Sequence, residues 1–70
     1  MELSIGDKVS ITVPLTYLKT AEPMPMLRPP DLVSQDELGE VVEIKPLKEV
    51  AVSFRRGTFL IPIKNLRVIN

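Results

Sequence analysis

Short alternations of apolar and polar residues, bounded by glycine or proline, constrain the fold of this chain more than any other feature. The clearest is KVSITV at residues 8–13, in which Val9, Ile11 and Val13 share one side and polar residues occupy the other. A period of two residues is typical of a half-buried strand. Pro14 ends this strand because proline has no amide donor. The pattern therefore predicts strands and not helices.

The same pattern recurs in the second half of the chain. Further strands are expected at residues 39–44, 50–54, 58–63 and 67–69. Their expected inward-facing side chains are Val50, Val52, Phe54, Phe59, Ile61 and Ile63. Pro62 marks the segment 58–63 as an edge strand or as a strand that ends in a bend. Residues 64–66 are expected to form a single helical turn.

These elements predict one all-β domain over residues 1–70. Five short strands, with a short helical turn before the last strand, fit a small five-stranded SH3-like barrel, which resolves the sheet-edge problem by curling. An OB-like barrel is the alternative, but no helix is found between its third and fourth strands. The hairpins are expected at residues 45–49 and at Arg55-Arg56-Gly57, where glycine can adopt a positive φ.

A long segment without clear periodicity, residues 14–38, follows the first strand. Structureless loops longer than roughly 12–15 residues are uncommon in compact domains and are mostly functional or disordered. Disordered segments are poor in large apolar side chains. This segment contains Leu15, Tyr17, Leu18, Met24, Met26, Leu27, Leu32 and Val33. We therefore expect a long Pro/Met-rich loop that packs one side against the core.

Two interpretations of Met24, Met26 and Leu27 stay open. They cap an open end of the barrel, or they form a partner-binding surface. Methionine suits adaptable contact surfaces, proline lowers the ordering cost of binding, and Arg28 beside two prolines provides a cation favoured at interfaces. The two interpretations are compatible, because a loop can pack on one side and present the other.

The composition argues against several functional classes. Nine basic and nine acidic residues give a net charge of zero, which disfavours tight nucleic-acid binding. Histidine and cysteine are absent, so the commonest general base, the strongest neutral-pH nucleophile and the best zinc ligands are missing. We expect a monomeric cytoplasmic protein that is not an enzyme, holds no metal or cofactor and does not insert into a membrane.

Two charged groups have alternative interpretations. Asp31, Asp36, Glu37, Glu40 and Glu43 suggest a hard-cation site, but their spacing matches no calcium loop, and a solvated face is the expected role. Arg55-Arg56 at a hairpin tip is either a solubilising turn, which is the favoured interpretation, or a docking point for an acidic spot on a partner. Arginine forms bidentate pairs with carboxylates.

Three segments resemble a known family. The sequence YLKTAEPMPMLRPPDL (17–32), after GDKVSITVPL (6–15) and before RRGTFLI (55–61), is similar to the SipA family of small cyanobacterial regulatory proteins. The resemblance extends from Ile5 to Leu66. It departs from the family pattern at Glu22, where aspartate is common, and at Lys48 and Glu49, where relatives carry an aromatic residue.

This resemblance implies an SH3-like barrel and a regulatory function in two-component signalling. Members of that family bind the sensor histidine kinase NblS at its ATP-binding region and stimulate its autophosphorylation in high-light and nutrient-stress signalling. With the chemistry of the loop and the hairpin tip, it yields the candidate partner-binding residues Lys19, Thr20, Pro23, Met24, Pro25, Met26, Leu27, Arg28, Pro29, Pro30, Arg55 and Arg56.

Two other classes of protein remain as alternatives. The first is an accessory SH3-like subunit of a photosynthetic electron-transfer complex, because barrels of similar size occur there. The second is a nucleic-acid module of the KOW kind, suggested by GDKV and GEVVEI. The zero net charge and the lack of an exposed aromatic row disfavour the second.

Overall fold

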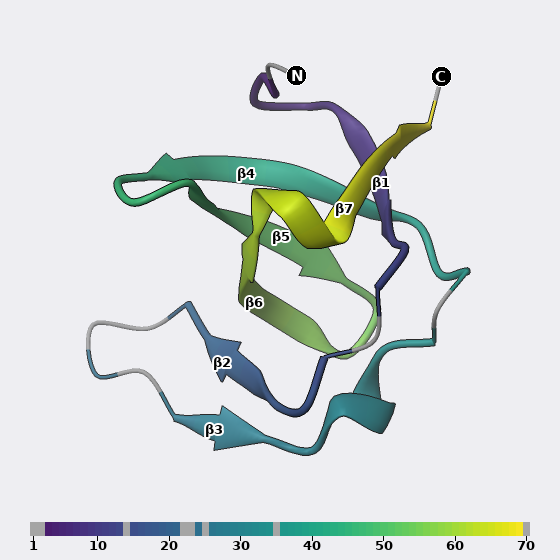
Figure 1. Cartoon of the computed structure of the whole chain (residues 1–70), viewed down its shortest axis with the longest axis vertical. Helices are drawn as coiled ribbons and strands as arrows, with labels where there is room; N and C mark the ends of the chain where they lie inside the picture. Colours follow the sequence, from purple (N-terminus) through teal and green to yellow (C-terminus); the bar gives the residue numbers. More distant parts are fainter. Residues whose placement is uncertain (1–2, 14, 22–23, 25, 35, 70) are drawn as a thin grey trace.

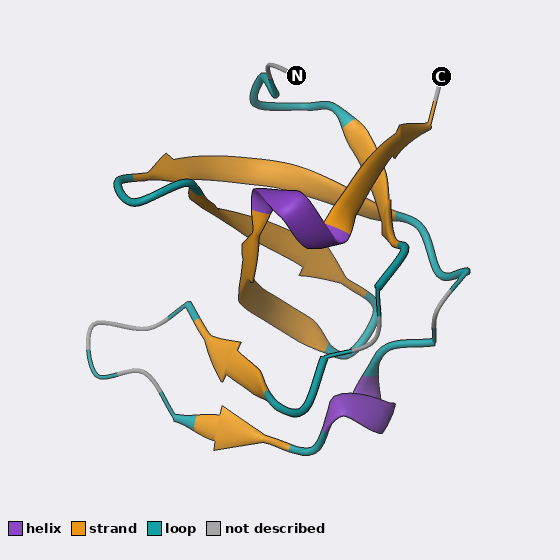
Figure 2. Cartoon of the chain, viewed as in Figure 1, coloured by secondary structure: helices purple, strands orange, loops and turns teal. Residues whose placement is uncertain are grey.

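The computed structural model describes residues 3–13, 15–21, 24, 26–34 and 36–69. These residues contain seven antiparallel strands in one sheet and no α-helix (Figures 1 and 2). The strands are β1 (Lys8–Ile11), β2 (Leu18–Thr20), β3 (Leu27–Arg28), β4 (Gly39–Lys45), β5 (Glu49–Phe54), β6 (Gly57–Pro62) and β7 (Leu66–Ile69). Two 3-10 turns, η1 (Pro30–Leu32) and η2 (Ile63–Asn65), complete the described part. The all-β class is confirmed.

The five expected strands correspond to β1 and β4–β7, and the expected helical turn corresponds to η2. Tight hairpins connect β4 to β5 and β5 to β6, with Lys45 opposite Glu49 and Phe54 opposite Gly57. Gly57 has a φ of 144°, which side chains rarely adopt. The alternation of apolar and polar residues that predicted these elements lies within each short segment, so it can be recognised without knowing how the segments pair.

The expectation of five strands is wrong, because the described residues contain seven. The order of the strands also does not show a closed five-stranded barrel. The strands lie in the order β3-β2-β6-β5-β4-β1-β7, which leaves β3 and β7 at the two edges. Both additional strands come from the segment expected to be an irregular loop. They have three and two residues, too few to show a period of two. β2 pairs with β6, which lies far along the chain, and β3 pairs with β2.

One hydrophobic core lies inside the curled sheet. Val50, Val52 and Phe54 are buried at 0, 0 and 6% exposure, and Phe59 and Ile61 are buried opposite them, as the alternation predicted. The other buried members of the core are Leu3, Val9, Ile11, Leu18, Val33, Val41 and Leu66. Ile63, expected inside, is only partly buried because it begins η2. The segment 14–38 thus contributes to the core through Leu18 and Val33.

Two details of the expected strands are corrected by the tertiary structure. Val13 was expected beside Val9 and Ile11, yet it is 50% exposed because β1 ends at Ile11. The chain leaves the sheet there, and the side chain of the buried Asn65 donates a hydrogen bond to the Val13 carbonyl at 3.2 Å. Pro62 is the last residue of β6 and turns the chain into η2, so its role is the bend. The strand itself is not an edge, because β2 pairs with its outer side.

Candidate functional site

A two-stranded ribbon formed by β2 and β3 extends one edge of the sheet (Figure 1). Lys19 and Thr20 pair with Leu60 and Phe59 of β6. At the end of the ribbon where residues 21–26 connect the two strands, the Thr20 amide donates to the Met26 carbonyl at 2.9 Å, and the Met26 amide donates to the Thr20 hydroxyl at 2.8 Å. Thr20 is 8% exposed. This candidate partner-binding residue therefore holds the ribbon together from within.

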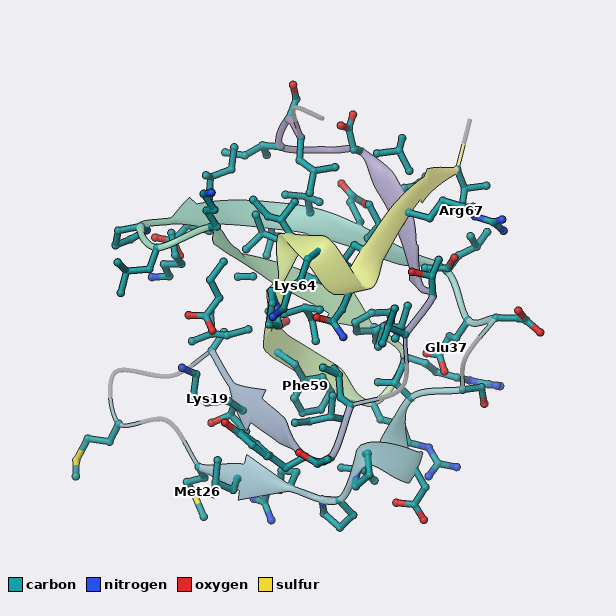
Figure 3. The ribbon with its side chains drawn as sticks, viewed as in Figure 1. Lys19, Met26, Glu37, Phe59, Lys64 and Arg67 are labelled. Carbon is teal, nitrogen blue, oxygen red and sulfur yellow. The ribbon has the colours of Figure 1, made fainter. Side chains whose placement is uncertain are left out.

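The ribbon packs on one side and presents apolar side chains elsewhere. Leu18 is buried at 1% exposure, whereas Met24, Met26 and Leu27 are 84, 51 and 66% exposed. Figure 3 shows Met26 pointing outward where β3 begins. We call Met24, Met26 and Leu27 the apolar ribbon residues. Of the two open interpretations, this arrangement favours a surface over a core cap, because side chains that seal a core are not half exposed.

An open pocket of about 500 Å³ lies where the ribbon meets the β5–β6 hairpin. Its wall combines residues from the segment 20–32 with residues 56–59 of the β5–β6 hairpin, which are far apart in the sequence. The lining residues are Thr20, Ala21, Arg28, Pro29, Leu32, Arg56, Gly57, Thr58 and Phe59. Arg28 lies opposite Leu18, so it shares a face of the sheet with Leu18 and with Thr20, two residues further along β2, which also lines the pocket. We call this hollow the Arg28/Arg56 pocket.

The two arginines of this pocket are not neutralised within the described part of the chain. The ion pairs found there join Lys8 to Glu40, Lys19 to Glu49 and Lys45 to Glu43, at 3.0, 3.3 and 3.0 Å. No acidic side chain is among the described residues that line the pocket. The site is therefore a concave surface with two available guanidinium groups. Guanidinium groups recognise carboxylates and phosphates through paired hydrogen bonds.

Glu37 is a residue of this region that the sequence reasoning placed in a solvated acidic face. Its carboxylate accepts a hydrogen bond from the Arg55 amide at 3.0 Å and one from the Ser34 amide at 3.4 Å. It therefore joins the turn before β4 to the tip of the β5–β6 hairpin, beside Arg56. A readable signal was present: Ser34 and Glu37 are spaced like the S-x-x-E capping box, in which the glutamate bonds back to the amide of the serine.

We predict that Glu37→Ala lowers the free energy of unfolding by about 1–2 kcal/mol, since two backbone amides lose a charged acceptor. Urea unfolding followed by circular dichroism measures this loss. Asp36→Ala is the matched control, because Asp36 is an exposed neighbour, and we expect it to change stability by less than about 0.5 kcal/mol. Equal effects for the two variants would mean that Glu37 does not hold the hairpin tip.

The remaining candidate residues divide between structural roles and the site. Lys19 forms an ion pair with Glu49 across β6, so its ammonium already has a partner. Pro29 lines the Arg28/Arg56 pocket, and Pro30 begins η1. Arg55 takes part through its amide and does not line the pocket. Pro23 and Pro25 lie outside the described residues.

The described residues contain neither a metal centre nor a membrane-spanning helix. They hold no group of three or more metal-ligating side chains placed around a common point. They also include no helix with the length and hydrophobicity needed to span a bilayer.

Comparison with known proteins decides the family. Residues 5–66 match the family model described as Protein CHLORORESPIRATORY REDUCTION 42-like, or CRR42-like. The chain belongs to the CRR42-like family. Searches of curated proteins and of solved structures gave no match to this CRR42-like chain.

This finding corrects the resemblance drawn from the Pro/Met segment. The match is to the CRR42-like family over nearly the whole chain, and the resemblance to the SipA family is wrong. The expected regulator of a sensor histidine kinase in two-component and stress signalling is wrong with it. The family description agrees better with the alternative, an accessory protein of a photosynthetic complex. The Pro/Met segment misled because a short exposed motif describes a surface and not the partner that covers it.

Proposed function

We propose that this CRR42-like protein is a non-catalytic accessory protein of a chlororespiratory or photosynthetic electron-transfer complex. The observation that carries the proposal is the family match over residues 5–66. The absence of histidine and cysteine from the sequence supports a binding role over a catalytic one, because these residues supply most acid–base and nucleophilic chemistry.

The β2–β3 ribbon is the proposed contact surface with the complex. Its three apolar residues are at least half exposed. Removing methionine and leucine side chains from water under a partner is favourable and stabilises the complex. The edge position of β3 leaves one side of the ribbon unpaired within the described residues. The curled sheet also supports a finer proposal for the fold, an SH3-like barrel extended at one edge by this ribbon.

Native gel electrophoresis of solubilised photosynthetic membranes tests the function. We expect the epitope-tagged chain to migrate with an electron-transfer complex or one of its assembly forms. We also expect removal of the chain to lower the amount of that complex and to slow reduction of the electron carriers in the dark. A tagged chain that migrates only as the free protein, together with an unchanged complex in its absence, would contradict the proposal.

A further inference from the structure

We propose that the Arg28/Arg56 pocket binds a glutamate or aspartate side chain, flanked by an apolar residue, in an acidic peptide segment of a protein partner. This inference rests on the proposed function in one respect, since the partner is taken to be a protein subunit of the complex. The pocket is concave and open, and it is built from strand, turn and hairpin residues that only the fold brings together.

The charge of the pocket selects an anion. Arg28 and Arg56 are both exposed, and within the described residues neither forms an ion pair. The nearby carboxylate of Glu37 is engaged with the Arg55 and Ser34 amides. Two arginines at one concave site can hold a single carboxylate from two directions, which gives shorter and stronger hydrogen bonds than neutral donors do.

The rest of the wall favours a carboxylate on a carbon side chain over a phosphate. Leu32 and Pro29 give the pocket an apolar surface on which methylene groups or a neighbouring apolar residue can pack. Besides the arginines, the polar side chains among the described lining residues are those of Thr20 and Thr58. The Thr20 hydroxyl already accepts a hydrogen bond from the Met26 amide. A phosphate, with more oxygens to satisfy, prefers sites that add several backbone amides or a helix N-terminus.

An amide NMR titration of the whole chain tests this proposal directly. The probe is the acetylated and amidated tetrapeptide Phe-Glu-Glu-Phe, and the matched control peptide has glutamine in place of each glutamate. We expect the acidic peptide to shift the amides of Arg28, Arg56, Gly57, Thr58 and Phe59, and the control peptide to bind at least fivefold more weakly. Equal binding of the two peptides, or no shift at these amides, would overturn the proposal.

Variants and a second ligand separate the remaining outcomes. Arg28→Glu and Arg56→Glu should each weaken peptide binding at least fivefold. Arg67→Glu is the control, because Arg67 is exposed on β7, well away from Phe59 in Figure 3. This variant should bind the acidic peptide as the original chain does. If Arg67→Glu weakened binding equally, overall charge and not the pocket would be responsible. If inorganic phosphate shifted the same amides at lower concentration than the peptide, the site would be a phosphate site and the proposal would be wrong.

The titration uses the isolated chain, so its failure can be told apart from failure of the proposed function. A chain that migrates with an electron-transfer complex but does not bind the acidic peptide retains its function and loses this inference. A chain that binds the peptide through both arginines but never joins such a complex retains the pocket and loses the proposed function.

Discussion

Gly39→Ala is expected to destabilise the protein by about 3 kcal/mol or more, at the upper end of the cost of overpacking a core. A methyl group at Gly39 would lie 2.5 Å from Cγ1 of Val52 and 2.7 and 2.9 Å from the ring of Phe54. Both side chains are buried and lie on β5, which pairs with β4, so neither can move away easily. Since a domain of this size is stabilised by only about 3–10 kcal/mol, the variant should be largely unfolded or marginally stable.

Thermal unfolding followed by circular dichroism measures the effect, with an expected fall in Tm of roughly 15 °C. Gly6→Ala is the matched control, because a methyl group there meets no atom within 4 Å. Its φ of 98° costs about 1 kcal/mol for a residue other than glycine. The control separates the strain of losing a glycine from the clash at Gly39. A loss at Gly39 no greater than that at Gly6 would contradict the close packing of β4 on β5.

Replacing Met24, Met26 and Leu27 together by serine is expected to reduce recovery of the partner complex at least tenfold while Tm changes by only a few degrees. The reason is their exposure of 84, 51 and 66%: little of their apolar surface stabilises the isolated chain. Buried under a partner, three such side chains can contribute much of the interface energy. The measurement is co-purification of the tagged variant with the complex, paired with thermal unfolding of the isolated variant.

The chain offers a matched control for this experiment. Ile5, Leu38 and Leu47 are 66, 56 and 94% exposed and lie outside the ribbon, so their joint replacement by serine removes a comparable apolar area. We expect that variant to retain the complex. If the two triple variants lost the complex equally, general surface hydrophobicity would explain the result. If the ribbon variant kept the complex, the ribbon would not be the docking surface.

Much of the fold was readable from local pattern. A strand of four or more residues shows its alternation without reference to its neighbours, which is why β1 and β4–β7 were found at nearly their observed positions. The two strands of the ribbon could not be found in this way, because they have only three and two residues. β2 is stabilised by pairing with the distant β6, and β3 is stabilised by pairing with β2. Glu37 joins the turn before β4 to the tip of the β5–β6 hairpin, and its capping-box spacing with Ser34 is the local signal for this role.

The sequence by itself determined the all-β class, the inward-facing residues of β5 and most of those of β6, and the chemical character of the Pro/Met segment, because these depend on the order of side chains along a few residues. Only the tertiary structure decided which members of that segment are structural and which are exposed. The Thr20 hydroxyl already accepts a hydrogen bond within the ribbon. Arg28, by contrast, lines the same pocket as Arg56, which lies 28 positions later in the chain. The pairing of two arginines at one pocket depends on strand register and hairpin docking, which are long-range interactions that no local pattern contains.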